Sequence, residues 1–224
     1  MSKPEFGPKS YGPGERSRVR RRAERASYDR EDVHAVLDAG HVVHVGMVMD
    51  DHPFVLPMAY VRVDETVYLH GSRGSRLMRN LAKGEPVSLT VTLVDGLVLA
   101  RSAFHHSMNY RCVSVFGCGR AVEEDTEKTR VLMAMVEGLC PGRAGDTRVP
   151  NEAELAATLL VGVAIDEASV KRRSGPAVDD ESDYSLDHWA GVVRLNTAPV
   201  AVEADSRMPS GTPLPGYLSR FVGS

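Results

Sequence analysis

Three apolar segments joined by very short connections constrain the fold of this chain more than any other feature of its sequence. The segments are residues 41–49, 54–63 and 66–71, and each is rich in Val, Tyr, Met or Leu. Only residues 50–53 and the pair 64–65 separate them, and connections of this length join antiparallel neighbours. The sequence therefore predicts three consecutive strands linked as two hairpins.

The rest of the chain adds more strands than helices. Apolar and polar residues alternate from Val87 to Val94, which predicts a half-buried strand, and Asp95-Gly96 predicts a turn after it. Further strands are expected over 110–122, 159–172 and 189–195, and helices over 30–39, 75–82, 126–139 and 151–157. Gly117 and Gly119 mark bulges or close backbone approaches. An antiparallel barrel with a few flanking helices fits this order better than a doubly wound sheet.

One globular domain accounts for most of the chain. Its 224 residues are 42% hydrophobic and 25% charged, which is typical of a single-core protein. We place the domain at residues 27–195, after a mobile basic arm (1–26) and before a proline-rich tail (196–224). The arginine run at 16–25 suggests a nucleic-acid arm or a solvated segment that lies on a partner subunit. A net charge of −3 and the lack of interleaved aromatic residues favour the solvated segment, so no nucleic-acid partner is expected.

Other protein classes find little support in the sequence. No apolar run reaches the ~18 residues of a membrane helix, and the N-terminal residues lack the apolar core of a signal peptide, so we expect a cytoplasmic protein without a membrane partner. Cys112, Cys118 and Cys140 have no metal-type spacing and predict free thiols. The histidines and acidic residues show no metal-ligand spacing either, and no metal is expected. Hydrolase, Walker and dinucleotide-fold motifs are missing.

The best candidate for a binding site is the stretch 67–81. It predicts a strand ending at His70, then a turn with Gly71, Ser72, Ser75 and Arg76, then a helix. Backbone N–H groups, hydroxyls and a guanidinium at a helix start can bind an anion such as phosphate. The alternative is an ordinary strand-to-helix connection with N-cap residues.

A second polar stretch, residues 102–113, could form the wall of the same pocket. Combined with the backbone of residues 55–58, the two stretches would suit a phosphorylated heteroaromatic cofactor. A polar connection before a strand is the alternative interpretation of residues 102–113.

Together these stretches resemble the FMN-binding split-barrel superfamily, in the pyridoxamine 5′-phosphate oxidase-related branch that includes the nitroimidazole-resistance flavoproteins. The resemblance covers about residues 16–195. It is carried by residues 28–31 through Gly46, 53–57, 69–72 with Ser75-Arg76, 95–111, Gly175-Pro176 with the acidic loop, and 189–192.

The resemblance implies a mainly β protein, a six-stranded antiparallel split barrel that forms a homodimer with two FMN sites between its subunits. The backbone of Leu56, Pro57 and Met58 would line the isoalloxazine ring. The groups near the ribityl phosphate and flavin edge would be His70, Gly71, Ser72, Ser75 and Arg76. Ser107, Asn109, Tyr110 and Arg111 would complete the pocket, some from the partner subunit.

The resemblance also implies an activity. The expected function is an FMN-dependent oxidoreductase that passes electrons from NAD(P)H to a small-molecule substrate such as a nitro compound or quinone. His70 is the one candidate catalytic group, as a general acid or as a neutral imidazole that hydrogen-bonds the cofactor. A non-catalytic flavin-binding or sensing dimer is the alternative, as is a split barrel that uses F420 or haem.

Two departures from the family pattern concern the pocket. Cys112 stands where a serine is usual, and Arg73 adds a charge to the phosphate turn. The C-terminal substrate signature of true pyridoxamine 5′-phosphate oxidases is missing, which argues against that reaction.

Overall fold

A computed structural model describes residues 6–221 of the chain. Residues 1–5 of the basic N-terminal stretch (1–26) and residues 222–224 of the expected tail lie outside the described residues. Nine strands and four α-helices are found in the described part. The strands are β1 (Ala26–Ser27), β2 (Val42–Met49), β3 (His52–Val63), β4 (Thr66–Ser72), β5 (Pro86–Leu99), β6 (Ser107–Ala121), β7 (Thr158–Ala164), β8 (Glu167–Arg173) and β9 (Gly191–Arg194). The helices are α1 (Arg30–Ala39), α2 (Arg76–Leu81), α3 (Asp125–Leu139) and α4 (Glu152–Ala157).

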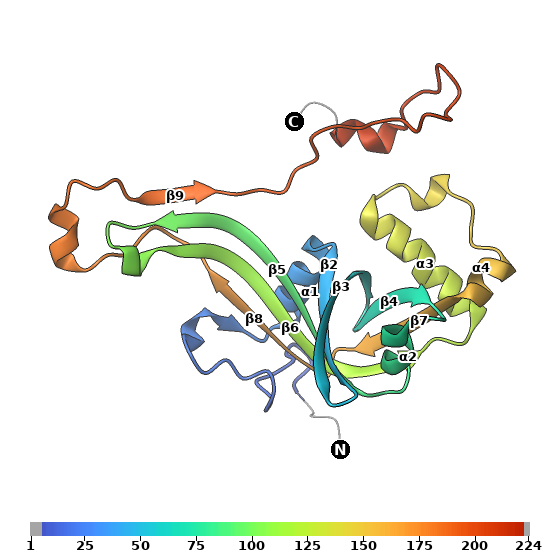
Figure 1. Ribbon diagram of the computed structural model, residues 1–224, viewed down its shortest axis with the longest axis horizontal. Coiled ribbons are helices and arrows are strands. Elements are labelled where there is room, and N and C mark those ends of the chain that lie inside the picture. Colours follow the sequence, from blue (N-terminus) through green and yellow to red (C-terminus); the bar gives the residue numbers. More distant parts are fainter. Residues whose placement is uncertain (1–5, 222–224) are drawn as a thin grey trace.

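Six of the strands close into a ring in the order β2-β3-β4-β7-β6-β5, and every pairing in the ring is antiparallel. The two hairpins expected from the sequence are β2–β3 and β3–β4 (Figure 1). β8 continues along β6 outside the ring, with β1 beyond it, and β9 pairs with the far edge of β5. The expected antiparallel barrel with flanking helices is confirmed.

Alternating side chains fill the barrel. Val87, Leu89 and Val91 of β5 are buried, as the alternation in the sequence predicts. Helix α1 packs Val33 and Leu37 into the same core. Its bounds match the expected 30–39, because apolar residues at helical spacing are followed by Gly40 as the C-cap.

Two sequence-based expectations about strands were wrong. Asp95-Gly96 does not form a turn, since β5 runs through it with only a register shift. A Cβ on Gly96 would lie 2.9 Å from the carbonyl oxygen of Val193, so the glycine permits close approach of β9. The single strand expected over 159–172 is two strands, β7 and β8, interrupted at residues 165–166.

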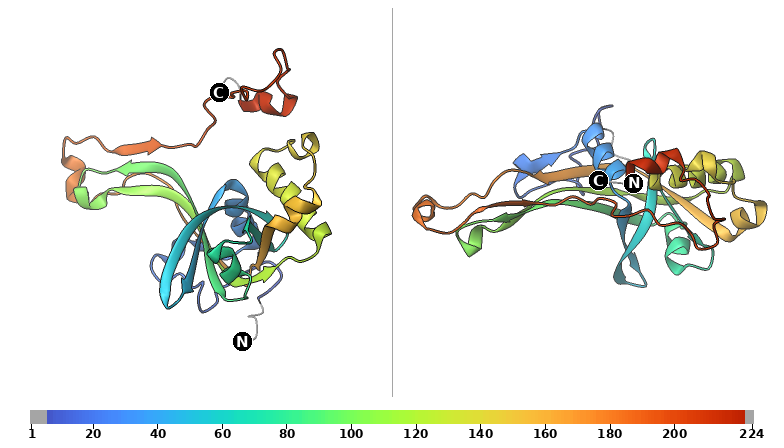
Figure 2. Two further views of the ribbon diagram at one scale, coloured as in Figure 1. Left: turned by 45° about the vertical axis from the view of Figure 1, so that its right-hand side comes forward. Right: turned by 90° about the horizontal axis from the view of Figure 1, so that it is seen from above.

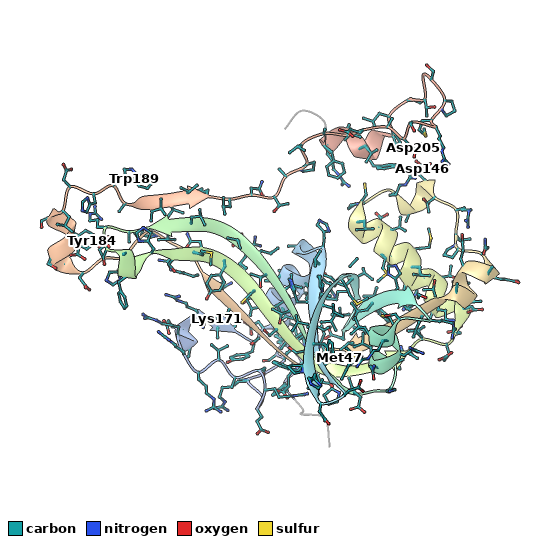
Figure 3. All side chains as sticks on the ribbon, viewed as in Figure 1. Met47, Asp146, Lys171, Tyr184, Trp189 and Asp205 are labelled. Carbon is teal, nitrogen blue, oxygen red and sulfur yellow. The ribbon has the colours of Figure 1, made fainter. Side chains whose placement is uncertain are left out.

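The β5–β6 hairpin projects far beyond the barrel, and we call its outer part, residues 92–112, the arm (Figure 1). β9 lies along one edge of the arm and β8 along the other. Tyr184 and Trp189 lie near the end of the arm, well away from Met47 in the barrel (Figure 3). Seen from above, the molecule is therefore elongated rather than round (Figure 2).

Parts of residues 6–26 pack on the barrel. Tyr11 is only 1% exposed, and its phenol contacts both His34 and Glu65. The buried hydroxyl of Ser17 donates to Glu167, and Glu167 also pairs with Arg16 at 2.9 Å. Tyr11 thus supplies core volume to the barrel from within the stretch that the sequence predicts to be mobile.

The chain from residue 196 to residue 221 leaves the end of β9 and returns toward α3 (Figure 1). Its last turn docks there: the Tyr217 hydroxyl donates to Asp146 at 2.8 Å, and Arg220 donates to the carbonyl oxygen of Pro141 at 3.0 Å. Between these ends the chain is exposed, with Val200 fully accessible.

Among residues 6–221, no helix is long and apolar enough to span a membrane.

Candidate functional site

The barrel opens between β3 and β4. The first part of β3, residues 52–59, pairs with β2, whereas its second part, Tyr60–Val63, pairs with β4. β4 beyond Leu69 pairs with β7 on its other side. Over the described residues, the edge of residues 52–59 that faces away from β2 therefore has no strand partner. Its backbone N–H and C=O groups remain available to a ligand.

Apolar side chains surround this free edge. Val55 and Leu56 point to opposite faces of β3, yet they are 65% and 41% exposed. Pro57 is exposed as well, and Met58 is half-buried against the core. This part of β3 is thus an apolar ribbon that solvent reaches from both faces, which is unusual for a barrel strand.

His70 lies at the end of β4, beside the opening. Its imidazole has no hydrogen-bond partner within the described chain, and partial burial lowers the pKa of His70 below its ordinary value. The lowered pKa favours the neutral imidazole, in which one nitrogen can donate and the other can accept.

The turn after β4 is held by its own hydroxyls. Ser72 Oγ accepts from the N–H of Gly74 at 3.1 Å, and Ser75 Oγ accepts from the N–H of Met78 at 3.3 Å as the N-cap of α2. Each hydroxyl keeps an O–H that can donate to a ligand. Gly71 serves packing, since a Cβ there would lie 2.8 Å from Met78 Cγ.

Arg76 spans the space between α2 and the β2–β3 turn. Its guanidinium lies 5.3 Å from the ring centre of Phe54 and pairs with the carboxylate of Asp50. Both partners are largely exposed, so the pair is weak and a phosphate could replace Asp50. Arg73 is directed elsewhere, because its Nε donates to the carbonyl oxygen of Ala156 at 2.6 Å.

The other predicted pocket residues lie on the arm of the same chain. Ser107 is exposed opposite Val98, and Asn109 donates to the carbonyl oxygen of Gly175 at 3.0 Å. Arg111 makes two hydrogen bonds to Asp95, of 3.0 and 2.7 Å. These residues and Tyr110 do not meet the β3–β4 group within one chain.

A cleft of about 520 Å³ lies on the arm among β5, β6, β8 and β9. Asn109, Tyr110 and Arg111 line it, as do Arg172, Arg173 and Arg194. The last three were not predicted as site residues. The basic end of the expected 159–172 strand was the available signal, but sequence could not place that end beside β9.

The residues at the opening fit a flavin. The apolar ribbon and the free backbone edge match a flat ring system with polar atoms along one side, and the serine hydroxyls and Arg76 suit a phosphate. Within the described chain, no group of three or more His, Cys, Asp or Glu side chains could hold a metal ion.

Sequence and structure comparisons define the family. The split barrel places the chain among proteins of that fold, and residues 29–172 match the family model of pyridoxamine 5′-phosphate oxidase. The chain belongs to this family, as the resemblance in the sequence predicted. No curated protein sequence matches it.

Two solved structures are similar over nearly the whole chain. The flavocytochrome Anf3 from Azotobacter vinelandii is 38% identical, with 93% of this chain and 97% of that chain covered and a TM-score of 0.87. An FAD- and haem-binding protein from Mycobacterium smegmatis is 36% identical, with 89% and 98% covered and a TM-score of 0.84. A putative 5-nitroimidazole resistance protein from Bacteroides thetaiotaomicron shares the fold, at 19% identity, 65% and 85% coverage and a TM-score of 0.56.

Proposed function

We propose that this chain is a flavoprotein oxidoreductase whose flavin lies in the opening between β3 and β4. The unpaired, apolar first half of β3 beside His70 is the observation that carries the proposal. The likeness to an FAD- and haem-binding protein at 36% identity supports it.

Each residue at the opening has a role in this proposal. Leu56, Pro57 and Met58 line the ring, while Ser72, Ser75 and Arg76 bind the phosphate next to the ribityl chain. A flavin held there would supply hydride and electron transfer, from NAD(P)H to a small acceptor such as a nitro compound or quinone. His70 hydrogen-bonds the flavin edge as a neutral imidazole, because burial lowers its pKa; proton donation to the reduced acceptor would require its protonated form.

A homodimer would complete the site. The arm exposes apolar side chains, among them Val94, Leu97 and Met108, and Phe104 at its end is 88% exposed. Exposed apolar groups clustered on a projecting hairpin are typical of an interface. In this arrangement the arm of a second copy covers the opening and brings Ser107 and Tyr110 to it.

Spectroscopy tests the flavin. Purified protein, or protein incubated with FMN or FAD and then dialysed, is expected to show oxidised-flavin absorption that bleaches under anaerobic NADPH or NADH. Protein that stays colourless would end the proposal. A bound flavin that neither nucleotide reduces would instead favour the non-catalytic binding dimer. The mass of the extracted cofactor separates FMN, FAD and F420.

Substitutions test the site itself. Arg76→Gln removes a charged donor and should weaken FMN binding about tenfold, since such hydrogen bonds contribute roughly 1.5–3 kcal/mol. Arg79→Gln is the matched control, because Arg79 is exposed on the same helix. Equal FMN affinity in the two variants would remove Arg76 from the site. His70→Gln should retain flavin and lower turnover.

Haem in addition to flavin is a second candidate, favoured by the likeness to two proteins described as a flavocytochrome and as FAD- and haem-binding. Haem iron needs an axial ligand such as histidine. His44 and His70 lie on barrel strands, and neither imidazole has a hydrogen-bond partner within the described chain. A Soret band in the purified protein, lost in one of the two His→Ala variants, would support this candidate. Protein that binds no haem after reconstitution would exclude it.

A further inference from the structure

The arginine-rich cleft on the arm lies apart from the β3–β4 opening of its own chain. Its walls come from four separate parts of the sequence: Asp95 of β5, residues 109–111 of β6, residues 172–176 at and after the end of β8, and β9. Its volume of about 520 Å³ is within the range of small-molecule sites. Nothing in the roles assigned above explains Arg172, Arg173 or Arg194.

Positive charge in the cleft is only partly neutralised. Asp95 pairs with Arg111 at 2.7 Å, and Asp32 pairs with Arg172 at 3.2 Å. These two guanidinium groups therefore have carboxylate partners within the chain.

The other two arginines lack a carboxylate. Arg173 donates to neutral oxygens only, the Asn109 side-chain amide at 2.5 Å and the Pro176 carbonyl at 3.0 Å. The Arg194 side chain forms no hydrogen bond or ion pair with the described residues. Burial, together with the nearby charge of Arg25, lowers the pKa of Arg173 from its ordinary value. The surplus charge favours an anion with at least two negative charges.

The remaining lining suggests the rest of the ligand. Tyr110 is half-buried in the cleft wall and offers an aromatic surface, and Val192 adds an apolar one. Gly175 also lines the cleft; it has a φ of 112° and open space where a Cβ would lie, so its backbone can be approached closely. An anion that carries a planar ring could contact both the arginines and the aromatic and apolar side chains.

We propose that this cleft binds the diphosphate of an adenine dinucleotide, with Arg173 and Arg194 on the phosphates and Tyr110 beside the adenine. The proposal rests on the proposed function for the identity of the dinucleotide. FAD and NAD(P)H share this chemistry, as a cofactor and as an electron donor.

ADP is the direct probe, because it carries the diphosphate and adenine without a flavin or nicotinamide. ADP is titrated calorimetrically, at one fixed ionic strength, into protein exchanged into FMN or, if no flavin binds, into protein as purified. We expect binding that Arg194→Gln weakens about tenfold, and that Arg130→Gln, an exposed change of equal charge on α3, leaves unchanged. No ADP binding, or equal affinity in wild type and Arg194→Gln, would overturn the proposal.

A loss of ADP affinity in Arg194→Gln can be distinguished from a loss of folding. Arg194 is exposed and makes no side-chain hydrogen bond or ion pair with the described chain, so Arg194→Gln should unfold at the wild-type temperature. Arg173→Lys keeps the charge and should weaken ADP less than Arg173→Gln does. Equal losses in the two Arg173 variants would contradict a charge-dependent role.

Comparing whole dinucleotides then identifies the source. If the ligand is FAD, wild type binds FAD more tightly than FMN and Arg194→Gln removes the difference. If it is NAD(P)H, Arg194→Gln raises the Kd of NADH or NADPH and leaves the FAD-to-FMN ratio unchanged. An ADP site on which neither dinucleotide depends would overturn the proposal.

The two proposals can fail separately. Protein that binds no flavin but binds ADP and NADH or NADPH through Arg194 would refute the flavoprotein and leave the cleft assignment standing. Protein that binds flavin but not ADP would refute the cleft assignment and leave the flavoprotein proposal standing.

Discussion

The phenol oxygen of Tyr11 lies 2.7 Å from Nε2 of His34 and also donates to the carboxylate of Glu65. A residue near the start of the chain is thereby joined to α1 and to the β3–β4 turn. The guanidinium of Arg30 lies 4.2 Å above the Tyr11 ring and also pairs with Glu65. The N-terminal segment is thus a structural part of the barrel.

Two substitutions of Tyr11 should destabilise the protein to different extents. Tyr11→Phe leaves Glu65 and His34 without the hydroxyl and should lower the free energy of unfolding by about 1–2 kcal/mol. Tyr11→Ala also removes the buried ring and should cost about 3–5 kcal/mol. Urea denaturation measures both, with Tyr184→Ala, a change at an exposed ring, as the control. Equal stabilities of Tyr11→Ala and Tyr184→Ala would contradict the packing described here.

His34 should make stability depend on pH. Burial first, and then the charge of Arg62, lower the pKa of His34 in the folded state, despite the opposing charge of Asp38. The unfolded chain then binds the proton more readily, so stability falls as the pH drops below the ordinary histidine pKa of about 6.5. The thermal midpoint should fall less between about pH 7.5 and about pH 5.5 in His34→Gln than in wild type. His188→Gln, a change at an exposed loop histidine, should retain the wild-type dependence.

Gly119 should not tolerate a side chain. A Cβ there would lie 2.1 Å from the carbonyl oxygen of Leu81, where backbone has little room to move. Gly119→Ala should therefore lower the free energy of unfolding by about 1–3 kcal/mol. Gly145→Ala adds the same methyl group where nothing lies within 4 Å and should be nearly neutral. A similar loss in both variants would show that the effect is not steric.

Asp179 should hold the end of the arm. Its carboxylate is inaccessible to solvent. It accepts hydrogen bonds from the backbone N–H of Arg101 at 2.9 Å and from that of Ser102 at 3.2 Å. Asp179→Ala should speed hydrogen exchange at these two amides, because their acceptor is lost. Asp187→Ala removes an exposed carboxylate from the same loop and should leave both rates unchanged.

Local signals predicted the local parts of this fold. The three early strands and α1 were found from alternation, helical spacing and turn residues, all of which act over a few positions. The turn expected at Asp95-Gly96 was wrong. Gly96 lies in a continuous strand and pairs with β9, which is almost a hundred residues further along the chain. No local pattern shows how far a hairpin continues past the barrel that it belongs to.

The same distinction between local and long-range contacts applies to the candidate site. His70, Gly71, Ser72 and Ser75 are consecutive or nearly so, and one strand and one turn place them together. The cleft on the arm joins Arg111, Arg173 and Arg194, which only the pairing of β6 with β8 and of β5 with β9 brings close. Its charge surplus depends on which carboxylates are near, and sequence alone does not give that.

The two outermost strands of the sheet bear on how this protein behaves at high concentration. β1 has two residues and β9 has four, so each end of the nine-stranded order offers few free backbone groups. Unpaired strand edges are where sheets of different molecules join and aggregate, and short edges limit this. Replacing the prolines after β9 would allow this edge strand to lengthen, and a longer free edge favours association between molecules.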